Sequence, residues 1–131
     1  MTKLLIYRTI WLGFLSWLIP FIISFFCYNA NGELLIDYRT FKSLMVIVGT
    51  FSGSYFLFLY FKVVNSDFVL NGIIVGFSWF AINILFDSIV LIPMMKVSFL
   101  TYFYSIGIVY ISIPAISIAM GYLLDKKANF N

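Results

Sequence analysis

Four long apolar runs, separated by short polar segments, dominate the hydrophobic pattern of this chain. They cover about residues 7–28, 43–61, 69–93 and 99–124. Each run has roughly the 20 residues that a helix needs to cross about 30 Å of hydrocarbon. The runs are apolar at odd and even positions alike, unlike the strands of a membrane β-barrel. The pattern therefore predicts an all-α polytopic membrane protein, with one transmembrane domain over residues 1–131 and four antiparallel helices in a bundle.

The polar segments between the runs predict how the helices are connected. Residues 29–42 form the longest connection, and Asn31 followed by Gly32 is a strong turn signal within it. This connection fits either an amphipathic stretch at the membrane interface or a solvated loop. Residues 62–67 predict a tight hairpin between the second and third helices. Pro93 is expected to end the third helix, because proline cannot donate a helical hydrogen bond.

The amino-acid composition supports the membrane assignment. The chain is 63% hydrophobic and only 10% charged, whereas soluble domains have about 25% charged residues. This small number of charges cannot cover the surface of a soluble protein. The apolar surface is therefore expected to face the lipid bilayer. The net charge of +3 resides at the ends of the apolar runs and forms no basic patch among aromatic residues. We therefore expect no nucleic-acid partner.

The chain lacks the residue sets that most enzymes and metal proteins use. It has no histidine, and Cys27 is its single cysteine. These counts exclude an intramolecular disulfide, a Cys–His pair and a Ser–His–Asp triad. No glycine-rich phosphate loop is present, and no two carboxylates occur together inside an apolar run. We therefore expect no enzyme activity, no metal and no cofactor.

The distribution of Lys and Arg predicts the orientation in the membrane. Five of the eight lie on the side of the two termini: Lys3, Arg8, Lys62, Lys126 and Lys127. This bias predicts that both termini lie in the cytoplasm, and we expect the protein in a bacterial inner membrane. The first run is longer than the roughly 7–15 apolar residues of a signal peptide, so it is expected to be a retained helix. Tyr102 and Tyr104 are expected at the outer membrane interface.

Small residues at helical spacing predict where the helices pack together. The three candidate packing pairs are Gly49 with Gly53, Gly72 with Gly76, and Ser117 with Gly121. A stripe of small and polar residues also follows the first helix at Thr9, Gly13, Ser16, Pro20, Ser24 and Cys27. These faces outnumber what one bundle core needs. A second copy of the chain or another membrane protein is therefore a possible partner.

Asp87 is the only charged residue inside any of the four runs, and Asn83 lies one helical turn before it. An acidic side chain at a helix centre costs about 2.5–3.5 kcal/mol on insertion scales, so it should be protonated, paired or hydrated. Three interpretations follow. Asp87 bonds Asn83 and a Ser, Tyr or Trp of a neighbouring helix and locks the bundle. Alternatively, it pairs with Arg39, Lys42 or Lys96 from the outer loops, or it binds a proton or cation on a transport path.

Residues 79–122 carry an ordered series of motifs. The positions are Asn83, Phe86-Asp87, Leu91-Ile92-Pro93, Tyr102-Phe103, Ile106-Gly107, Tyr110 and Ile113-Pro114. The series resembles a group of small, uncharacterised prokaryotic four-helix membrane proteins, which have Leu where this chain has Phe86. The resemblance covers about a third of the chain. It implies the four-helix membrane fold and carries no assigned activity.

The sequence thus favours a non-enzymatic membrane protein with a structural, accessory or scaffold role. The alternative is a small transporter or ion-conducting protein in which Asp87 is the proton or cation site. Small multidrug-resistance transporters also have four helices, but their essential glutamate lies in the first helix, where this chain has no acidic residue.

Overall fold

The structure, a computed structural model, describes residues 2–131. Within this range four helical segments are long and apolar enough to cross a membrane: Lys3–Phe25, Tyr38–Phe61, Phe68–Met95 and Gly107–Phe130. The prediction of an all-α membrane protein with four helices is confirmed.

Two of the four segments are composite. The elements, in chain order, are α1 (Lys3–Phe25), α2 (Tyr38–Phe61), α3 (Phe68–Phe86), the π-helix η1 (Asp87–Leu91), α4 (Ile92–Met95), α5 (Phe99–Ser105), the 3-10 helix η2 (Gly107–Ile111) and α6 (Ser112–Phe130).

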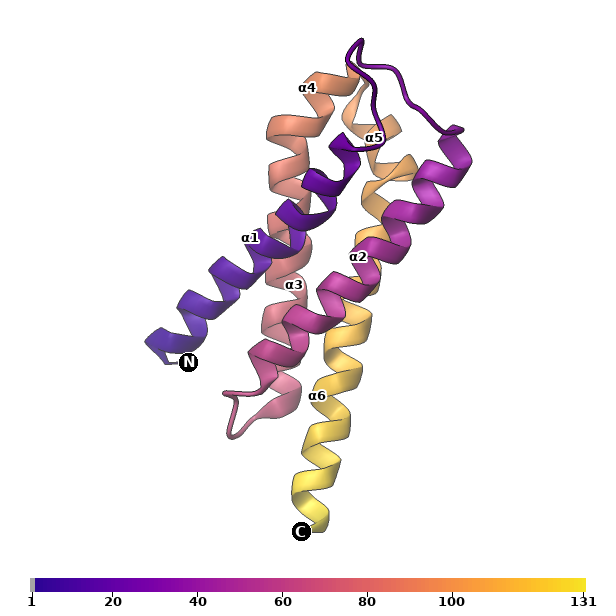
Figure 1. Cartoon of the computed structure of the whole chain (residues 1–131). Helices are drawn as coiled ribbons and strands as arrows, with labels where there is room; N and C mark the ends of the chain where they lie inside the picture. Colours follow the sequence, from indigo (N-terminus) through magenta and orange to yellow (C-terminus); the bar gives the residue numbers. More distant parts are fainter. Residues whose placement is uncertain (1) are drawn as a thin grey trace.

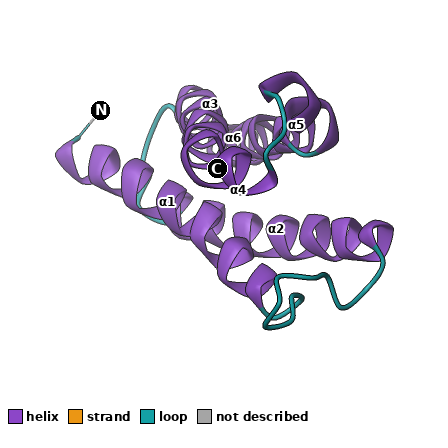
Figure 2. Cartoon of the chain, turned by 90° about the horizontal axis from the view of Figure 1, so that it is seen from above, coloured by secondary structure: helices purple, strands orange, loops and turns teal. Residues whose placement is uncertain are grey.

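The helices form two layers. Helices α1 and α2 lie in one layer, and α3 and α6 pack closely together in the other (Figures 1 and 2). The two termini and the α2–α3 turn lie at one end of the bundle. The loop before α2 and the α4–α5 turn lie at the opposite end (Figure 1).

Polar capping residues shift the helix ends away from the predicted bounds. Thr2 accepts a hydrogen bond from the Leu5 N–H, so α1 begins four residues before the predicted run. Asp37 accepts one from the Thr40 N–H at 3.1 Å, so α2 begins at Tyr38. The hydrogen bonds from Thr40 also lower the pKa of Asp37, because they stabilise the ionised form of this cap. Hydropathy alone does not record such caps.

The third helix does not end at Pro93, contrary to the prediction. It continues to Met95 through η1, whose wider turn has the Ile92 N–H bonded to the Asp87 carbonyl. A proline ring clashes with the carbonyl four residues earlier, here that of Ile89. The π turn directly before Pro93 accommodates this clash and keeps the segment helical.

The fourth apolar run is broken, whereas the sequence predicted one helix over residues 99–124. Helix α5 ends at Ser105, and Ile106 leaves the helical region with φ −127° and ψ −54°. The 3-10 helix η2 then leads into α6. Gly107 is buried at the break, and a Cβ there would lie 3.0 Å from Phe103 Cδ2 and 3.1 Å from Ile84 Cδ1. A glycine inside a helix weakens it, and this one permits close contact with α3.

Helices α3 and α6 pack through the small residues that the sequence singled out. A Cβ at Gly72 would lie 2.6 Å from the Ser117 carbonyl oxygen, and a Cβ at Gly121 would collide with the Phe68 carbonyl oxygen. The Ser117 hydroxyl also donates a hydrogen bond of 2.7 Å to the Gly72 carbonyl. The four residues Gly72, Gly76, Ser117 and Gly121 therefore form one close interface.

Helix α1 packs on α3 through the first half of its small-residue stripe. A Cβ at Gly13 would lie 2.7 Å from Trp79 Cδ1, and the Trp79 indole N–H donates to the Thr9 carbonyl at 2.8 Å. Thr9, Gly13 and Ser16 are buried, whereas Pro20, Ser24 and Cys27 are only partly buried. The stripe is thus a packing face only in its N-terminal half, before Pro20.

Helix α2 joins the bundle only near its C-terminal end. Its buried residues are Leu57, Tyr60 and Phe61. The Arg8 guanidinium donates to the Leu59 carbonyl at 2.9 Å, and the Tyr60 hydroxyl donates to Asn71 Oδ1 at 3.0 Å.

The close contact predicted at Gly49 and Gly53 is not made within the chain. No atom lies within 4 Å of a Cβ built at either position. The N-terminal half of α2 diverges from α3 and α6, and the two glycines face the space left between them.

Glycines at a helix–helix contact and glycines that face the open space should respond differently to a larger side chain. Gly76→Leu is expected to lower the free energy of unfolding by about 1–3 kcal/mol or more, because its Cβ would meet Ser117 Oγ and lie 2.7 Å from Pro114 Cα. Gly53→Leu, the control, has open space around it. Thermal unfolding in lipid nanodiscs measures both, and equal losses would contradict this packing.

Candidate functional site

Asp87 is the first residue of η1, and its side chain is almost fully buried, with 2% of its surface exposed. Its Oδ1 accepts a hydrogen bond of 2.7 Å from the Trp17 indole N–H. Its Oδ2 accepts hydrogen bonds from the Tyr102 hydroxyl at 2.6 Å and the Tyr110 hydroxyl at 2.7 Å. We call these four residues the Asp87 cluster.

The cluster connects three of the four membrane segments. Trp17 comes from α1, Asp87 from the third segment, and Tyr102 and Tyr110 from α5 and η2 on either side of the helix break. In a continuous helix the α-carbons of residues eight positions apart would lie about 12 Å apart along the axis. Tyr102 and Tyr110 nevertheless donate to the same carboxylate oxygen, one from each side of the helix break.

The partners of Asp87 are neutral, and Asn83 is not one of them. The Asn83 amide instead donates to Ser16 Oγ at 3.3 Å and to the Trp79 carbonyl at 2.9 Å. In the described part of the chain, no hydrogen bond joins Asp87 to Arg39, Lys42 or Lys96. The geometry thus corresponds to the interpretation with Tyr and Trp partners, without the expected bond to Asn83.

The number of donors suits an ionised carboxylate. An ionised carboxylate accepts all three hydrogen bonds, and the indole N–H of Trp17 can only donate. A proton on Oδ2 would have to be donated to one tyrosine oxygen, which would leave that tyrosine's own hydrogen without an acceptor in the cluster. The geometry therefore provides a preformed cage of donors around a carboxylate inside the membrane.

Aromatic packing holds the Trp17 indole in position. Trp17 stacks on Phe86 with ring centroids 5.0 Å apart and on Phe21 with centroids 4.8 Å apart. Phe86 directly precedes Asp87, so the same contact fixes the start of η1. Such aromatic pairs contribute about 0.5–1.5 kcal/mol beyond the area that they bury.

A cavity of about 610 Å³ lies between α2 and the other helices. It extends from Leu57 and Trp79 deep in the bundle to Tyr28, Tyr38 and Lys42 beside the loop before α2. Its lining is mostly apolar, but Ser16, Trp17, Asn83, Asp87 and Tyr110 contribute polar groups to one wall. Gly49 and Gly53 lie on the opposite wall, where the absence of side chains enlarges the cavity.

Tyr28 and Gly32 line the end of the cavity beside the loop before α2. Partial burial, with smaller effects of Cys27 and Tyr38, raises the pKa of the Tyr28 hydroxyl. Gly32 in the loop has φ +77°, as expected for the turn predicted at Asn31 and Gly32.

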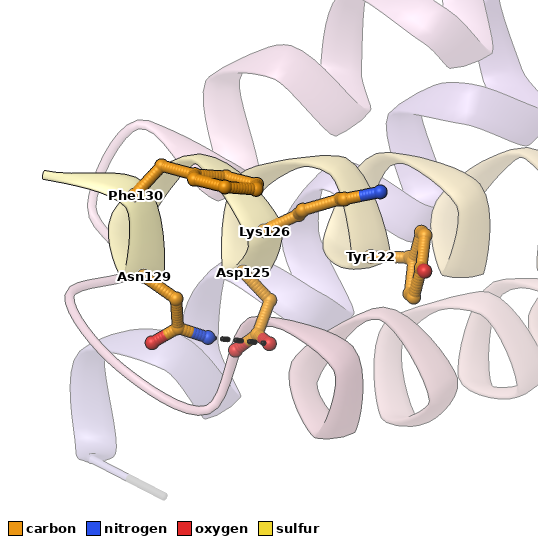
Figure 3. Close-up of a pocket in the computed structure, with 5 residues that line it drawn as sticks. All are labelled: Tyr122, Asp125, Lys126, Asn129 and Phe130. Atoms are coloured by element: carbon orange, nitrogen blue, oxygen red, sulfur yellow. Dashed lines mark hydrogen bonds between the residues drawn. The ribbon is translucent and has the colours of Figure 1, made fainter.

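A second hollow of about 280 Å³ lies at the C-terminal end of α6 (Figure 3). Its lining residues, Tyr122, Asp125, Lys126, Asn129 and Phe130, all belong to α6, and the Asn129 amide donates to Asp125 at 3.3 Å. Because no second element contributes a wall, we do not consider it a site.

Sequence reasoning found Asp87 but not the identity of its partners. Tyr102 and Tyr104 were expected together at the outer membrane interface, which stays a prediction; within the bundle Tyr102 is fully buried and Tyr104 is 70% exposed. Tyr110 appeared only in the motif series of residues 79–122; its hydroxyl donates to Asp87. Trp17 lies four residues after Gly13, on the packing face of α1, and this spacing is the signal that could have identified it.

Within residues 2–131, no group of three acidic or cysteine side chains is placed to hold a metal ion. Comparison of the chain with protein-family models, with curated proteins and with solved structures found no match. The resemblance of residues 79–122 to a group of small prokaryotic membrane proteins stays a prediction.

Removal of a single donor tests the energetic role of the Asp87 cluster. Trp17→Phe and Tyr102→Phe should each lower the free energy of unfolding by about 0.5–1.5 kcal/mol, because each removes one hydrogen bond to a buried carboxylate. Tyr104→Phe is the matched control, since Tyr104 is 70% exposed. If Tyr102→Phe costs no more than Tyr104→Phe in nanodiscs, the hydrogen bonds do not stabilise the bundle.

Proposed function

We propose that this integral membrane protein is non-enzymatic and has a structural, accessory or scaffold role. The observation that carries the proposal is the Asp87 cluster, in which an intramembrane carboxylate accepts hydrogen bonds from three neutral donors of other helical elements. Such an arrangement fixes the positions of α1, the third segment and the broken fourth segment relative to one another. A defined bundle of this kind suits a protein whose task is to present a fixed surface within the bilayer.

We further propose a bacterial inner membrane location with both termini in the cytoplasm. Both termini lie at the end of the bundle that carries the α2–α3 turn (Figure 1), and this end holds five of the eight Lys and Arg residues. The excess of cations supports a cytoplasmic position for it.

An accessory role requires a partner, which we propose to be a second copy of the chain or another membrane protein. Crosslinking in native membranes should then yield a species larger than the monomer. Recovery of monomer alone, under conditions that crosslink a known membrane dimer, would contradict the accessory role.

A second candidate function is transport, and a specific observation favours it. Asp87 and Asn83 both lie on the wall of the 610 Å³ cavity, so the carboxylate adjoins a space that a transported proton or cation could enter. Intramembrane carboxylates commonly mark such paths. The two candidate functions therefore differ in the role of Asp87: it either only holds the helices together, or it also binds a transported proton or cation.

Asp87→Asn distinguishes the two candidates. The amide keeps the shape but replaces one acceptor oxygen with a donor, so one or two donors of the cluster lose their acceptor. The structural proposal predicts a loss of about 1–3 kcal/mol in the free energy of unfolding, together with lower abundance in the membrane.

The matching functional measurement is flux of protons, Na⁺ and K⁺ in proteoliposomes. The structural proposal predicts that the parent protein conducts none of them above empty vesicles. Flux in the parent that Asp87→Asn abolishes, with the variant still folded, would favour transport and contradict a purely structural role.

A further inference from the structure

We propose that the 610 Å³ cavity is a binding site for a lipophilic organic cation. The charged centre would lie beside the Asp87 cluster and Asn83, and the apolar groups would extend toward Gly49 and Gly53 of α2. The inference concerns equilibrium binding, so it rests on the cavity and not on the structural role proposed for Asp87.

The first argument is charge. The donors around Asp87 suit its ionised form, and these donors are neutral. In the region that the structure describes, Asp87 has no hydrogen-bonded cation as its partner, although it lies inside the membrane span. An unpaired negative charge interacts strongly with a nearby cation in a medium of low dielectric constant. A cationic ligand in the cavity would supply the missing positive charge.

The second argument is a free acceptor next to the carboxylate. Asn83 uses its amide nitrogen for bonds to Ser16 and Trp79. Among residues 2–131, no donor bonds its side-chain oxygen, and Asn83 lines the cavity. Because every buried side-chain polar atom of the described residues has a hydrogen-bond partner, this unbonded oxygen is open to the cavity, where a ligand donor or a positive charge can approach it. Both polar groups on this wall therefore favour the same sign of ligand charge.

The third argument is the nature of the apolar lining. Aromatic side chains contribute to this lining: Trp17 and Tyr110 belong to the Asp87 cluster, Phe21 stacks on Trp17, and Trp79 lies deeper in the bundle. Aromatic faces attract cations, most strongly when both are desolvated. Met45 and Met94 line the same space, and methionine adapts its shape to bulky ligands. The volume also lies within the roughly 300–1,000 Å³ that is typical of small-molecule sites.

Lys42 provides the alternative. It lines the cavity beside the loop before α2, so an anionic amphiphile could place its head group there. We favour the cation because the acceptors Asp87 and Asn83 and the aromatic rings lie together on the wall, whereas Lys42 is a single charge at one end. The sign of the ligand charge is therefore the decisive property to test.

Tetraphenylphosphonium and tetraphenylborate form a matched pair of probes, because they have the same shape and opposite charge. Each is titrated against the protein in nanodiscs of zwitterionic lipid, with empty nanodiscs to subtract partition into the bilayer. We expect saturable binding of tetraphenylphosphonium, at least about tenfold tighter than that of tetraphenylborate. Tighter binding of tetraphenylborate, or no saturable binding of either ion, would overturn the proposal.

Gly53→Leu tests the location without touching the Asp87 cluster. The new side chain would fill the cavity from the wall of α2, where no atom lies within 4 Å of its Cβ. We expect it to weaken tetraphenylphosphonium binding by about tenfold or more while the melting temperature stays near that of the parent. Phe51→Leu, on the exposed face of α2, is the control and should bind as the parent does.

Asp87→Asn adds the test of charge. In variant protein that remains folded, tetraphenylphosphonium should bind more weakly and the preference over tetraphenylborate should shrink. Unchanged binding in both Gly53→Leu and Asp87→Asn would overturn the proposal. Loss of stability without loss of binding in Asp87→Asn would support the structural role of Asp87 and count against the cation site.

Discussion

A carboxyl group inside hydrocarbon must be satisfied by the protein that carries it, because lipid offers neither water nor counter-ions. In this protein the requirement is met by two hydroxyls and an indole N–H that converge on Asp87. The surrounding irregularities support this convergence. The π turn begins at Asp87 itself, and the fourth apolar run breaks between Tyr102 and Tyr110, the two tyrosines that bond Asp87. The least regular backbone of the bundle is thus located where its one intramembrane charge must be bonded.

The remaining contacts divide the bundle into a tight part and an open part. Glycines and Ser117 bring the backbones of α3 and α6 together, and Gly13 does the same for α1 against α3. Helix α2 is bonded at its C-terminal end and diverges along its N-terminal half. The cavity is the space that this divergence leaves, and it reaches the Asp87 cluster from one side. Stability and a possible ligand site therefore depend on the same carboxylate.

Much of the fold could be predicted from the sequence, because hydropathy and small-residue spacing depend on local pattern alone. The four spans, the hairpin at residues 62–67 and the role of Gly72 and Ser117 as packing residues follow from such patterns, whereas the pairing of α3 with α6 comes from the structure. The break at Ile106 was not predicted, because the run is apolar throughout and the contacts that accompany the break, those of Gly107 with Ile84 and of two tyrosines with Asp87, join residues distant in the sequence. Gly49 and Gly53 show that a local pattern can also predict a contact that is not made. Their spacing indicates a packing face, but the angle between the helices decides whether a neighbouring helix reaches it.

The most direct test of the account is a double-mutant cycle between Asp87→Asn and Trp17→Phe, with the free energy of unfolding measured in nanodiscs. If the indole N–H is bonded to the carboxylate as the structure shows, the two losses should be non-additive, with a coupling energy of about 0.5–2 kcal/mol. Losses that add to within about 0.3 kcal/mol would show that the two residues act independently. That result would contradict the claim that Asp87 ties α1 to the rest of the bundle.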